Sequence, residues 1–135
     1  DFFATVCDYA GAQLPAGVSG QSLRPILQGE TASAWPDHLV SEVENEHLHK
    51  HQRGRMVRSQ HFKYMAYERG RNREQLFDLE ADSGEMNNLA KLPEFHDELQ
   101  RHREYLREWC QTTNDTFGRH YPHPDVQFMI PGDEY

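Results

Sequence analysis

The sequence is poor in cysteine and in positive charge, and each shortage excludes a class of protein. Two cysteines among 135 residues cannot build a disulfide framework. Cys7 and Cys110 both lie among apolar neighbours, so we expect buried thiols, with a bridge or a reactive role as the alternative. Fourteen Lys and Arg against 22 Asp and Glu leave a net charge of -8, which argues against nucleic acid and anionic membranes as partners.

Long apolar runs are also missing. No segment approaches the roughly 20 apolar residues that a membrane-spanning helix needs, and no secretory signal pattern occurs, so we expect a soluble chain whose compartment stays open. The hydrophobic content of 36% is nevertheless sufficient for one modest core. Because the first residue is Asp1 rather than Met, and an apolar helical pattern begins at once, we expect a piece of a longer polypeptide.

Residues 1–37 predict two helices joined by a turn-rich connection. Apolar residues recur at helical spacing behind Asp1, a possible N-cap, and Gly11 is a stop signal. A second, short helix is expected after Ser22 as N-cap, with Gly29 as C-cap.

The middle of the chain predicts an antiparallel meander of about four strands. Its segments alternate between apolar and polar residues, as strands do when one face is wet. Gln60 and His61 lie where the second segment gives way to the third, which predicts a tight hairpin. The predicted strands are 38–44, 54–60, 62–68 and 74–80.

A long helix is expected to open at Pro93 and to cover one face of this sheet, which gives an α+β fold. From residue 112 onward the chain is rich in Pro and Gly, and we expect an extended tail over 112–135. The apolar stripe of the helix comprises Phe95, Leu99, His102, Leu106, Trp109 and Cys110.

The stretch "QLFDLEADSGEMNNLA", residues 75–90, begins like a strand and ends in turn residues that lead into the helix. It resembles the Leu-Phe-Asp-Leu-x-x-Asp-x-x-Glu-x-x-Asn-Leu signature near the C-terminus of the sulfatase family, within the alkaline-phosphatase-like superfamily. Earlier segments resemble family segments in the same order over about residues 1–110. These segments are "DFFATVCDYAG", "GQSLRPILQG" and "RMVRSQHFKYMAY".

The resemblance implies the C-terminal region of a sulfuric ester hydrolase, of the arylsulfatase or N-sulfoglucosamine sulfohydrolase type. Residues 1–37 would be two helices left over from the catalytic α/β domain, 38–111 the C-terminal subdomain and 112–135 the tail. The parent enzyme would carry formylglycine, made from Cys or Ser, and Ca²⁺. This sequence contains neither the nucleophile motif nor the metal ligands, so we expect no catalytic residue, no metal and no cofactor in it, and no activity of the chain alone.

The polar stretch "ENEHLHKHQRGR", residues 44–55, is the best candidate for a binding segment. It separates two predicted strands, and long polar connections inside a domain are often functional. The resemblance implies that such loops help to wall the substrate pocket, and we take Asn45, His49 and Arg55 as candidate substrate-binding residues. His47, His49 and His51 alternate and could instead bind a transition metal, or they could belong to a solvated loop with no ligand.

Three readings of the function stay open. The first is a sulfatase C-terminal part that partners the missing N-terminal catalytic domain and helps to bind a sulfated small molecule or sugar. The second is the equivalent part of a phosphonate or phosphodiester hydrolase of the same superfamily. The third is a free-standing binding module, for example for a metal. A homodimer of the chain is a further expectation, because the two helices at the start have apolar faces to bury.

Overall fold

The structure is a computed structural model that describes residues 1–18, 20–30, 35–47, 50–68 and 70–119, and the side chains of these residues except at 45–47, 50–52, 118 and 119. The chain divides into two compact units, Asp1–Pro36 and Asp37–Tyr135.

In the first unit, α1 (Phe2–Ala10) confirms the predicted first helix and its end. Gly11 has a left-handed backbone with φ of 65°, a conformation that costs glycine little, and its N–H donates to the carbonyl of Asp8. Asp1 stands at the N-cap position without a side-chain capping bond, because its carboxylate accepts the N–H of Gln21 at 2.9 Å.

The second helix, α2 (Arg24–Leu27), is short as predicted, but its caps differ. Leu23 rather than Ser22 is the N-cap, and Gln28 is the C-cap, one residue before the predicted cap at Gly29. The Ser22 hydroxyl donates instead to Asp8 at 2.6 Å, so its interaction joins the second helix to the first. Side-chain hydrogen bonds therefore tie the two helices of this unit together.

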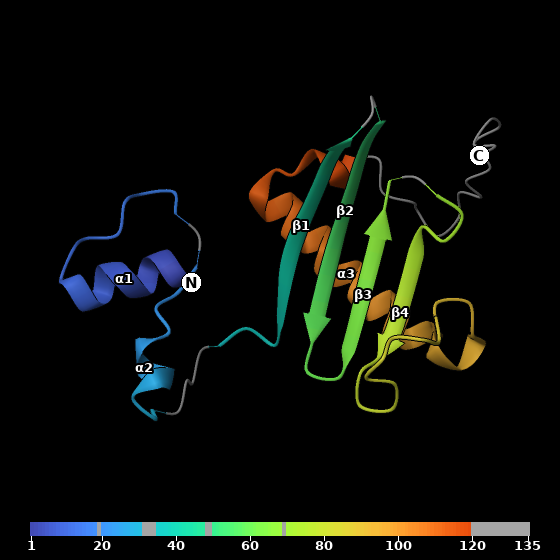
Figure 1. Cartoon of the computed structure of the whole chain (residues 1–135), viewed down its shortest axis with the longest axis horizontal. Helices are drawn as coiled ribbons and strands as arrows, with labels where there is room; N and C mark the ends of the chain where they lie inside the picture. The colour runs from blue at the N-terminus through green and yellow to red at the C-terminus, as the bar shows by residue number, and fades with distance from the viewer. Residues whose placement is uncertain (19, 31–34, 48–49, 69, 120–135) are drawn as a thin grey trace. The chain divides into compact units, whose positions relative to one another are not determined.

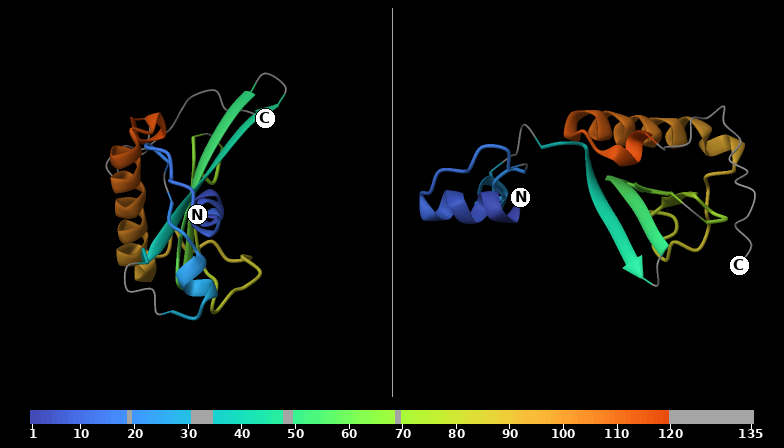
Figure 2. Two further views of the ribbon diagram at one scale, coloured as in Figure 1. Left: turned by 90° about the vertical axis from the view of Figure 1, so that its left-hand side faces the viewer. Right: turned by 90° about the horizontal axis from the view of Figure 1, so that it is seen from above.

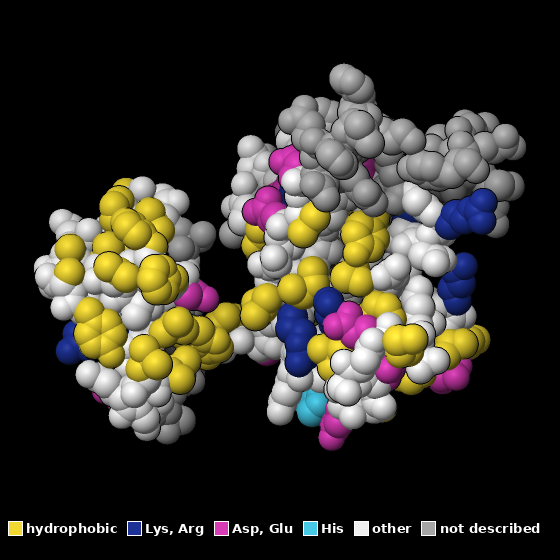
Figure 3. Space-filling view, viewed as in Figure 1, with side chains coloured by type: hydrophobic (Ala, Val, Ile, Leu, Met, Phe, Trp, Pro, Cys, Tyr) yellow, Lys and Arg dark blue, Asp and Glu magenta, His cyan; other side chains and the backbone are white. Residues whose placement is uncertain are grey.

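Large apolar side chains remain exposed on the first unit, where Figure 3 shows hydrophobic groups gathered over α1 and α2. Phe2 is 80% exposed and Leu27 is 67% exposed. Two short helices have too little surface to bury every apolar face between them. On the two helices the exposed set comprises Phe2, Phe3, Val6, Tyr9, Ile26 and Leu27.

The second unit contains the predicted antiparallel meander, a four-stranded sheet in the order β1-β2-β3-β4 (Figure 1). The two-residue hairpin Gln60-His61 joins β2 to β3, as predicted. The strands are β1 (His38–His47), β2 (Lys50–Ser59), β3 (Phe62–Tyr67) and β4 (Glu74–Asp78).

Outside residues 48 and 49, which the structure does not describe, the polar stretch 44–55 is strand rather than loop, and the prediction of a loop there was wrong. β1 and β2 continue through it in register, from the pair Glu44–Arg53 to the pair His47–Lys50. Alternating hydrophobicity reveals a strand only where one face is buried, and this stretch is polar at nearly every position. Backbone pairing with the neighbouring strand extends both strands here without an apolar face.

The long helix α3 (His96–Thr113) covers one face of the sheet, as Figure 2 shows from two further sides. A short 3-10 helix, η1 (Pro93–Phe95), precedes it at the predicted start, and η2 (Thr116–Arg119) follows it. Of the predicted stripe, Leu99, His102, Leu106 and Cys110 are buried. Both cysteines are buried thiols, as expected. Sheet and helix together enclose a core of Val57, Tyr64, Ala66, Leu76, Leu99, Leu106, Cys110 and Phe117.

The stretch 75–90 closes the outer edge of β4. The Asn88 side chain accepts the N–H of Leu76 at 3.0 Å and donates to the carbonyl of Glu74 at 3.1 Å. The N–H of Leu89 donates to the carbonyl of Leu76 at 2.8 Å. Asp82, at the turn, accepts the N–H of Asn87 at 2.7 Å. The signature residues therefore shape a turn that covers the strand edge.

Within the described ranges, no helix is long and apolar enough to cross a lipid bilayer.

Candidate functional site

The candidate binding segment forms the outer part of the β1–β2 hairpin. In the described part of the sheet, the β2–β3 register ends at the pair Gly54–Tyr67, whereas β1 and β2 stay paired as far as His47 and Lys50. We call residues 44–47 and 50–53 the outer ribbon. At about 3.3 Å per residue, it extends roughly 13 Å beyond the four-stranded part of the sheet.

The three predicted site residues have different places. Asn45 lies on β1 within the outer ribbon, opposite Gln52 in the backbone register. His49 lies outside the described residues. Arg55 lies on β2 at the base of the outer ribbon, three positions from Gln52, and an odd spacing assigns two positions of a strand to opposite faces. The structure therefore does not bring Asn45 and Arg55 together on one face.

Arg55 is buried under the end of α3. Its side chain is 4% exposed, and its guanidinium makes a two-pronged contact with Asp115, from Nε to Oδ2 at 2.7 Å and from Nη2 to Oδ1 at 3.1 Å. Nη1 donates to the carbonyl of Gly54 at 2.8 Å, and Nη2 is 3.4 Å from Glu42. Planar paired contacts of this kind fix both the distance and the orientation of a guanidinium. Protein partners therefore occupy the donors of Arg55.

An aromatic ring completes this environment. The guanidinium carbon of Arg55 is 4.9 Å from the ring centroid of Phe117, and that of Arg53 is 5.6 Å from it. Phe117 is 2% exposed, and its N–H donates to Asp115 at 2.9 Å. Arg53 donates from Nη1 to the hydroxyl of Thr116 at 3.1 Å. Cation–π contacts away from water stabilise such a stack. We call Glu42, Arg53, Arg55, Asp115 and Phe117 the Arg55 cluster.

The charges of the cluster shift the pKa values of its central pair. Burial acts to lower the pKa of Arg55, but the hydrogen bonds and charge of Asp115, together with the charge of Glu42, outweigh it, and that pKa is raised. Burial acts to raise the pKa of Asp115, yet the hydrogen bonds of Arg55 and of the Phe117 N–H leave that pKa lowered. Both groups therefore stay charged near neutral pH. Removing one partner of such a buried pair typically costs about 3–5 kcal/mol.

The described part of this region carries more negative than positive charge. Arg53 also lies 3.9 Å from both Glu44 and Glu68, and the Arg55 cluster adds Glu42 and Asp115. The carboxylates of this region neutralise the charge of its guanidinium groups. The base of the ribbon is therefore better suited to stabilising the ribbon than to binding a free anion.

The structure tests for metal ligands only in the part of the chain that it describes. No group of three or more His, Cys, Asp or Glu side chains there could hold a metal ion. Cys7 and Cys110 are buried on helices. The side chains of His47 and His51 lie outside the described set, so the metal reading of the histidines stays a prediction.

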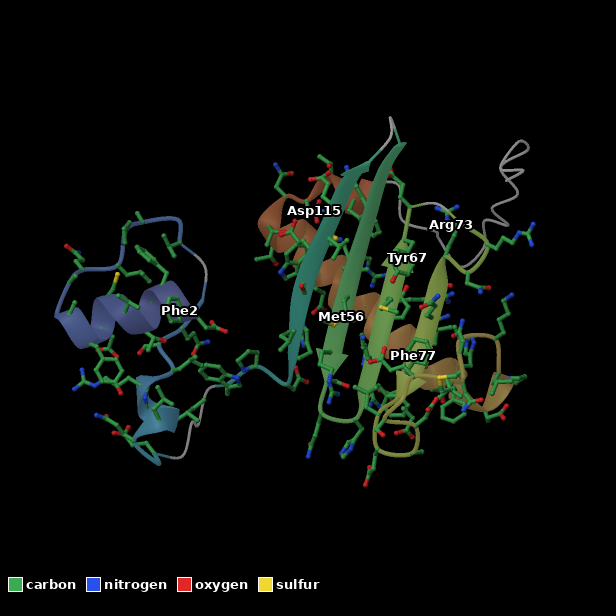
Figure 4. All side chains as sticks on the ribbon, in the orientation of Figure 1. Phe2, Met56, Tyr67, Arg73, Phe77 and Asp115 are labelled. Carbon is green, nitrogen blue, oxygen red and sulfur yellow. The ribbon has the colours of Figure 1, made fainter. Side chains whose placement is uncertain are left out.

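Sequence reasoning missed Asp115 and Phe117, which it assigned to an extended tail. A usable signal was present, since Asn114 ends α3 in a left-handed conformation with φ of 55° and reverses the chain toward the sheet. An acid and an aromatic residue directly after such a reversal indicate a segment that folds back. Figure 4 shows Asp115 at the end of α3, near the upper parts of β1 and β2.

Comparisons with known proteins relate this chain to the C-terminal parts of sulfatases. The family model for N-sulphoglucosamine sulphohydrolase, C-terminal, matches residues 1–112. A Delta 4,5-hexuronate-2-O-sulfatase of Bacteroides thetaiotaomicron is 38% identical over 117 residues, which are 87% of this chain and 24% of that protein. The solved structure of a 2-O GAG sulfatase, also 38% identical, has a TM-score of 0.79 and covers 87% of this chain and 25% of its own.

A more distant likeness concerns the fold alone. The phosphonate monoester hydrolase of Silicibacter pomeroyi is 23% identical, with a TM-score of 0.70 over 86% of this chain and 25% of that chain. The chain thus spans about a quarter of the length of the proteins to which these comparisons relate it.

Proposed function

The chain belongs to the sulfatase family, in the C-terminal region of the N-sulphoglucosamine sulphohydrolase type, and we propose that it is the C-terminal part of an enzyme that hydrolyses sulfate esters. The observation that carries the proposal is the 38% identity to a sulfatase across 87% of the chain, together with the family match over residues 1–112.

Within that enzyme, we assign a structural and substrate-shaping role to this chain. The described residues contain no group that fits a metal ion, and neither cysteine lies in the family's nucleophile motif. Ca²⁺ and formylglycine, which the family resemblance implies, therefore do not fit this part of the protein. The residues that break the ester bond belong to the catalytic domain, which we propose as the partner of this chain.

The outer ribbon is the part of the chain that we assign to the substrate. It projects beyond the four-stranded sheet and carries Asn45 and Lys50, and the candidate His49 lies next to Lys50 in the sequence. Amide, imidazole and ammonium groups suit the hydroxyl, carboxylate and sulfate groups of a sulfated sugar. The relative named as a hexuronate-2-O-sulfatase supports a sulfated sugar acid as the substrate class. Arg55, with its donors occupied, supports the ribbon rather than contacting the substrate.

A phosphonate monoester hydrolase is the second candidate, favoured by the fold likeness to such an enzyme. The two candidates differ in the ester that the parent protein prefers. The full-length protein that carries this chain should therefore be assayed with 4-nitrophenyl sulfate, a 2-O-sulfated unsaturated hexuronate and a phenyl phosphonate monoester. We expect preferred turnover of a sulfate ester, whereas preference for the phosphonate would replace the first proposal by the second.

The purified 135-residue chain provides the matched test of its own role. It should hydrolyse none of these esters, and sulfate release by this chain alone would contradict the assignment of the chemistry to another domain. Calorimetric titration of the same chain with Zn²⁺ tests the binding-module reading. Heat at the level of the buffer control would exclude a zinc site formed by the histidines.

A further inference from the structure

The outer ribbon needs support that the sheet does not provide. Two-stranded ribbons are marginally stable in water on their own, and this one continues past the last β2–β3 pair. At its base, the N–H of Glu68 donates to the carbonyl of Arg53 at 2.9 Å. Apart from that bond and the ion pair of Arg53 with Glu68 at 3.9 Å, the described contacts of the ribbon with the rest of the unit come from its helix side.

The segment after α3 supplies these contacts. Asp115 holds Arg55 through two hydrogen bonds, Thr116 holds Arg53, and Phe117 lies against both guanidinium groups. The N–H of Asp115 in turn donates to the carbonyl of Cys110 at 2.9 Å, so the segment is anchored to the helix. The ribbon is thus bound at its base by a segment that is itself anchored to α3.

We propose that Asp115 and Phe117 are positioning residues, which set the direction of the outer ribbon and thereby the shape of the substrate-binding wall. This inference rests on the proposed function, because the wall is the role assigned to the ribbon above. Neither residue touches the substrate. Both act through Arg55 and Arg53 on β2.

A competing partner explains why the charge of Asp115 matters. Glu42 lies on β1, 3.4 Å from Nη2 of Arg55, with a side chain that is 58% exposed. When Asp115 loses its charge, the stronger remaining attraction for Arg55 is Glu42, toward solvent. The guanidinium then leaves the face of Phe117, and the base of the ribbon loses its connection to α3.

The test uses the full-length protein that carries this chain, with the variants Asp115→Asn and Phe117→Leu. The first removes the charge and retains the shape, while the second retains burial and removes the ring. Asp97→Asn is the matched control, because it makes the same chemical change at an exposed carboxylate on α3, the helix that Asp115 follows. Amide hydrogen exchange is followed over residues 44–53, and kcat and KM are measured with 4-nitrophenyl sulfate and a 2-O-sulfated unsaturated hexuronate.

We expect both variants to accelerate exchange in the outer ribbon about tenfold or more, while amides of β3 and β4 keep their protection. The ratio of kcat/KM for the hexuronate to kcat/KM for the small aryl ester should fall about tenfold, mainly through KM, since only the larger substrate reaches the wall. The control should change neither quantity. An Asp115→Asn protein that fails to fold leaves Phe117→Leu to decide the question.

The possible outcomes distinguish a failure of the positioning role from a failure of the proposed sulfatase function. Unchanged exchange in the ribbon overturns the positioning role. Faster exchange with an unchanged substrate ratio also overturns it, because the ribbon then moves without affecting the substrate, although the enzyme remains a sulfatase. A wild-type protein that hydrolyses neither sulfate ester overturns the proposed function, and unchanged exchange in that protein's variants would overturn the positioning role as well.

Discussion

His102 makes the stability of the second unit depend on pH. Its side chain is 0% exposed on α3 and bridges the helix to the sheet. The carbonyl of Glu98, 2.9 Å from Nδ1, can only accept, so Nδ1 carries the hydrogen and Nε2 accepts from the hydroxyl of Ser59 at 3.0 Å. Phe62 and Tyr105 place ring edges against the imidazole. Burial of the ring in this arrangement favours its neutral form.

Burial lowers the pKa of His102 below the ordinary value of 6.5, and the charges of Arg101 and His38 act in the same direction, against the opposing effect of Glu98. Below about pH 6.5 the unfolded chain therefore binds a proton that the folded chain does not. The contribution to stability is complete above that pH and is lost as the pH falls toward the folded-state pKa, at up to about 1.4 kcal/mol per pH unit.

The perturbation is His102→Gln, whose amide oxygen can still accept from Ser59 but cannot titrate. At pH 8 the variant should lose about 1–3 kcal/mol, because a buried hydrogen bond and part of the ring packing disappear. Between pH 7 and pH 5 its stability should fall less steeply than that of the wild type, by up to about 1.4 kcal/mol per pH unit.

Urea unfolding of both proteins at a series of pH values measures this difference. Both proteins share the other histidines, so their contributions cancel in the difference, and a His38→Gln background removes a neighbouring imidazole whose charge acts on His102. Parallel stability curves for the wild type and for His102→Gln would refute the reasoning, since they would mean that the buried ring takes up its proton as readily as an exposed one.

The remaining predictions concern the signature turn, the sheet and the first unit. Asn88→Ala should destabilise the chain by about 2–3 kcal/mol in urea unfolding, because it removes the side chain that closes the β4 edge, whereas Asn87→Ala should cost less than about 1 kcal/mol; equal losses would contradict the edge role. Gly54→Ala places a Cβ 3.0 Å from the Tyr67 ring and should cost about 1–3 kcal/mol, and an unchanged urea midpoint would show that the ring moves freely. Light scattering of the isolated chain should detect self-association driven by the exposed helices, and Phe2→Ser should weaken it; a monomer at all concentrations would exclude the dimer.

Much of the sheet could be predicted because burial of one face makes apolar and polar residues alternate along its strands. Val57 and Tyr64 face the same core from neighbouring strands, and their alternation with polar residues identified both strands. The spacing of Leu99 and Leu106 likewise identified the face of α3 that meets the sheet. In these elements the apolar residues are the buried ones, so the local sequence pattern is enough to predict the strands and the buried face of the helix.

The outer ribbon and the contacts that support it could not be predicted, because they depend on residues far apart in the sequence. Glu44 and Arg53 lie in a stretch that is polar at nearly every position, so no apolar alternation marks them as strand residues. Arg55 finds its partner, Asp115, 60 positions along the chain, beyond a helix whose exact end decides where the acid falls. The sequence marked Arg55 as a cation of interest, but its environment depends on tertiary contacts that no local pattern contains.

The hydrogen bonds of Asn88 and Leu89 to the edge of β4 determine at which edge the sheet can accept a further strand. A side-chain amide and a main-chain N–H imitate the next strand, so the groups that would recruit a neighbour there are already taken. In the described sheet, β1 is the opposite margin. A strand added by a larger assembly or by an aggregating copy would therefore join beside β1, and the charged residues Glu42 and Glu44 on that strand oppose unwanted additions.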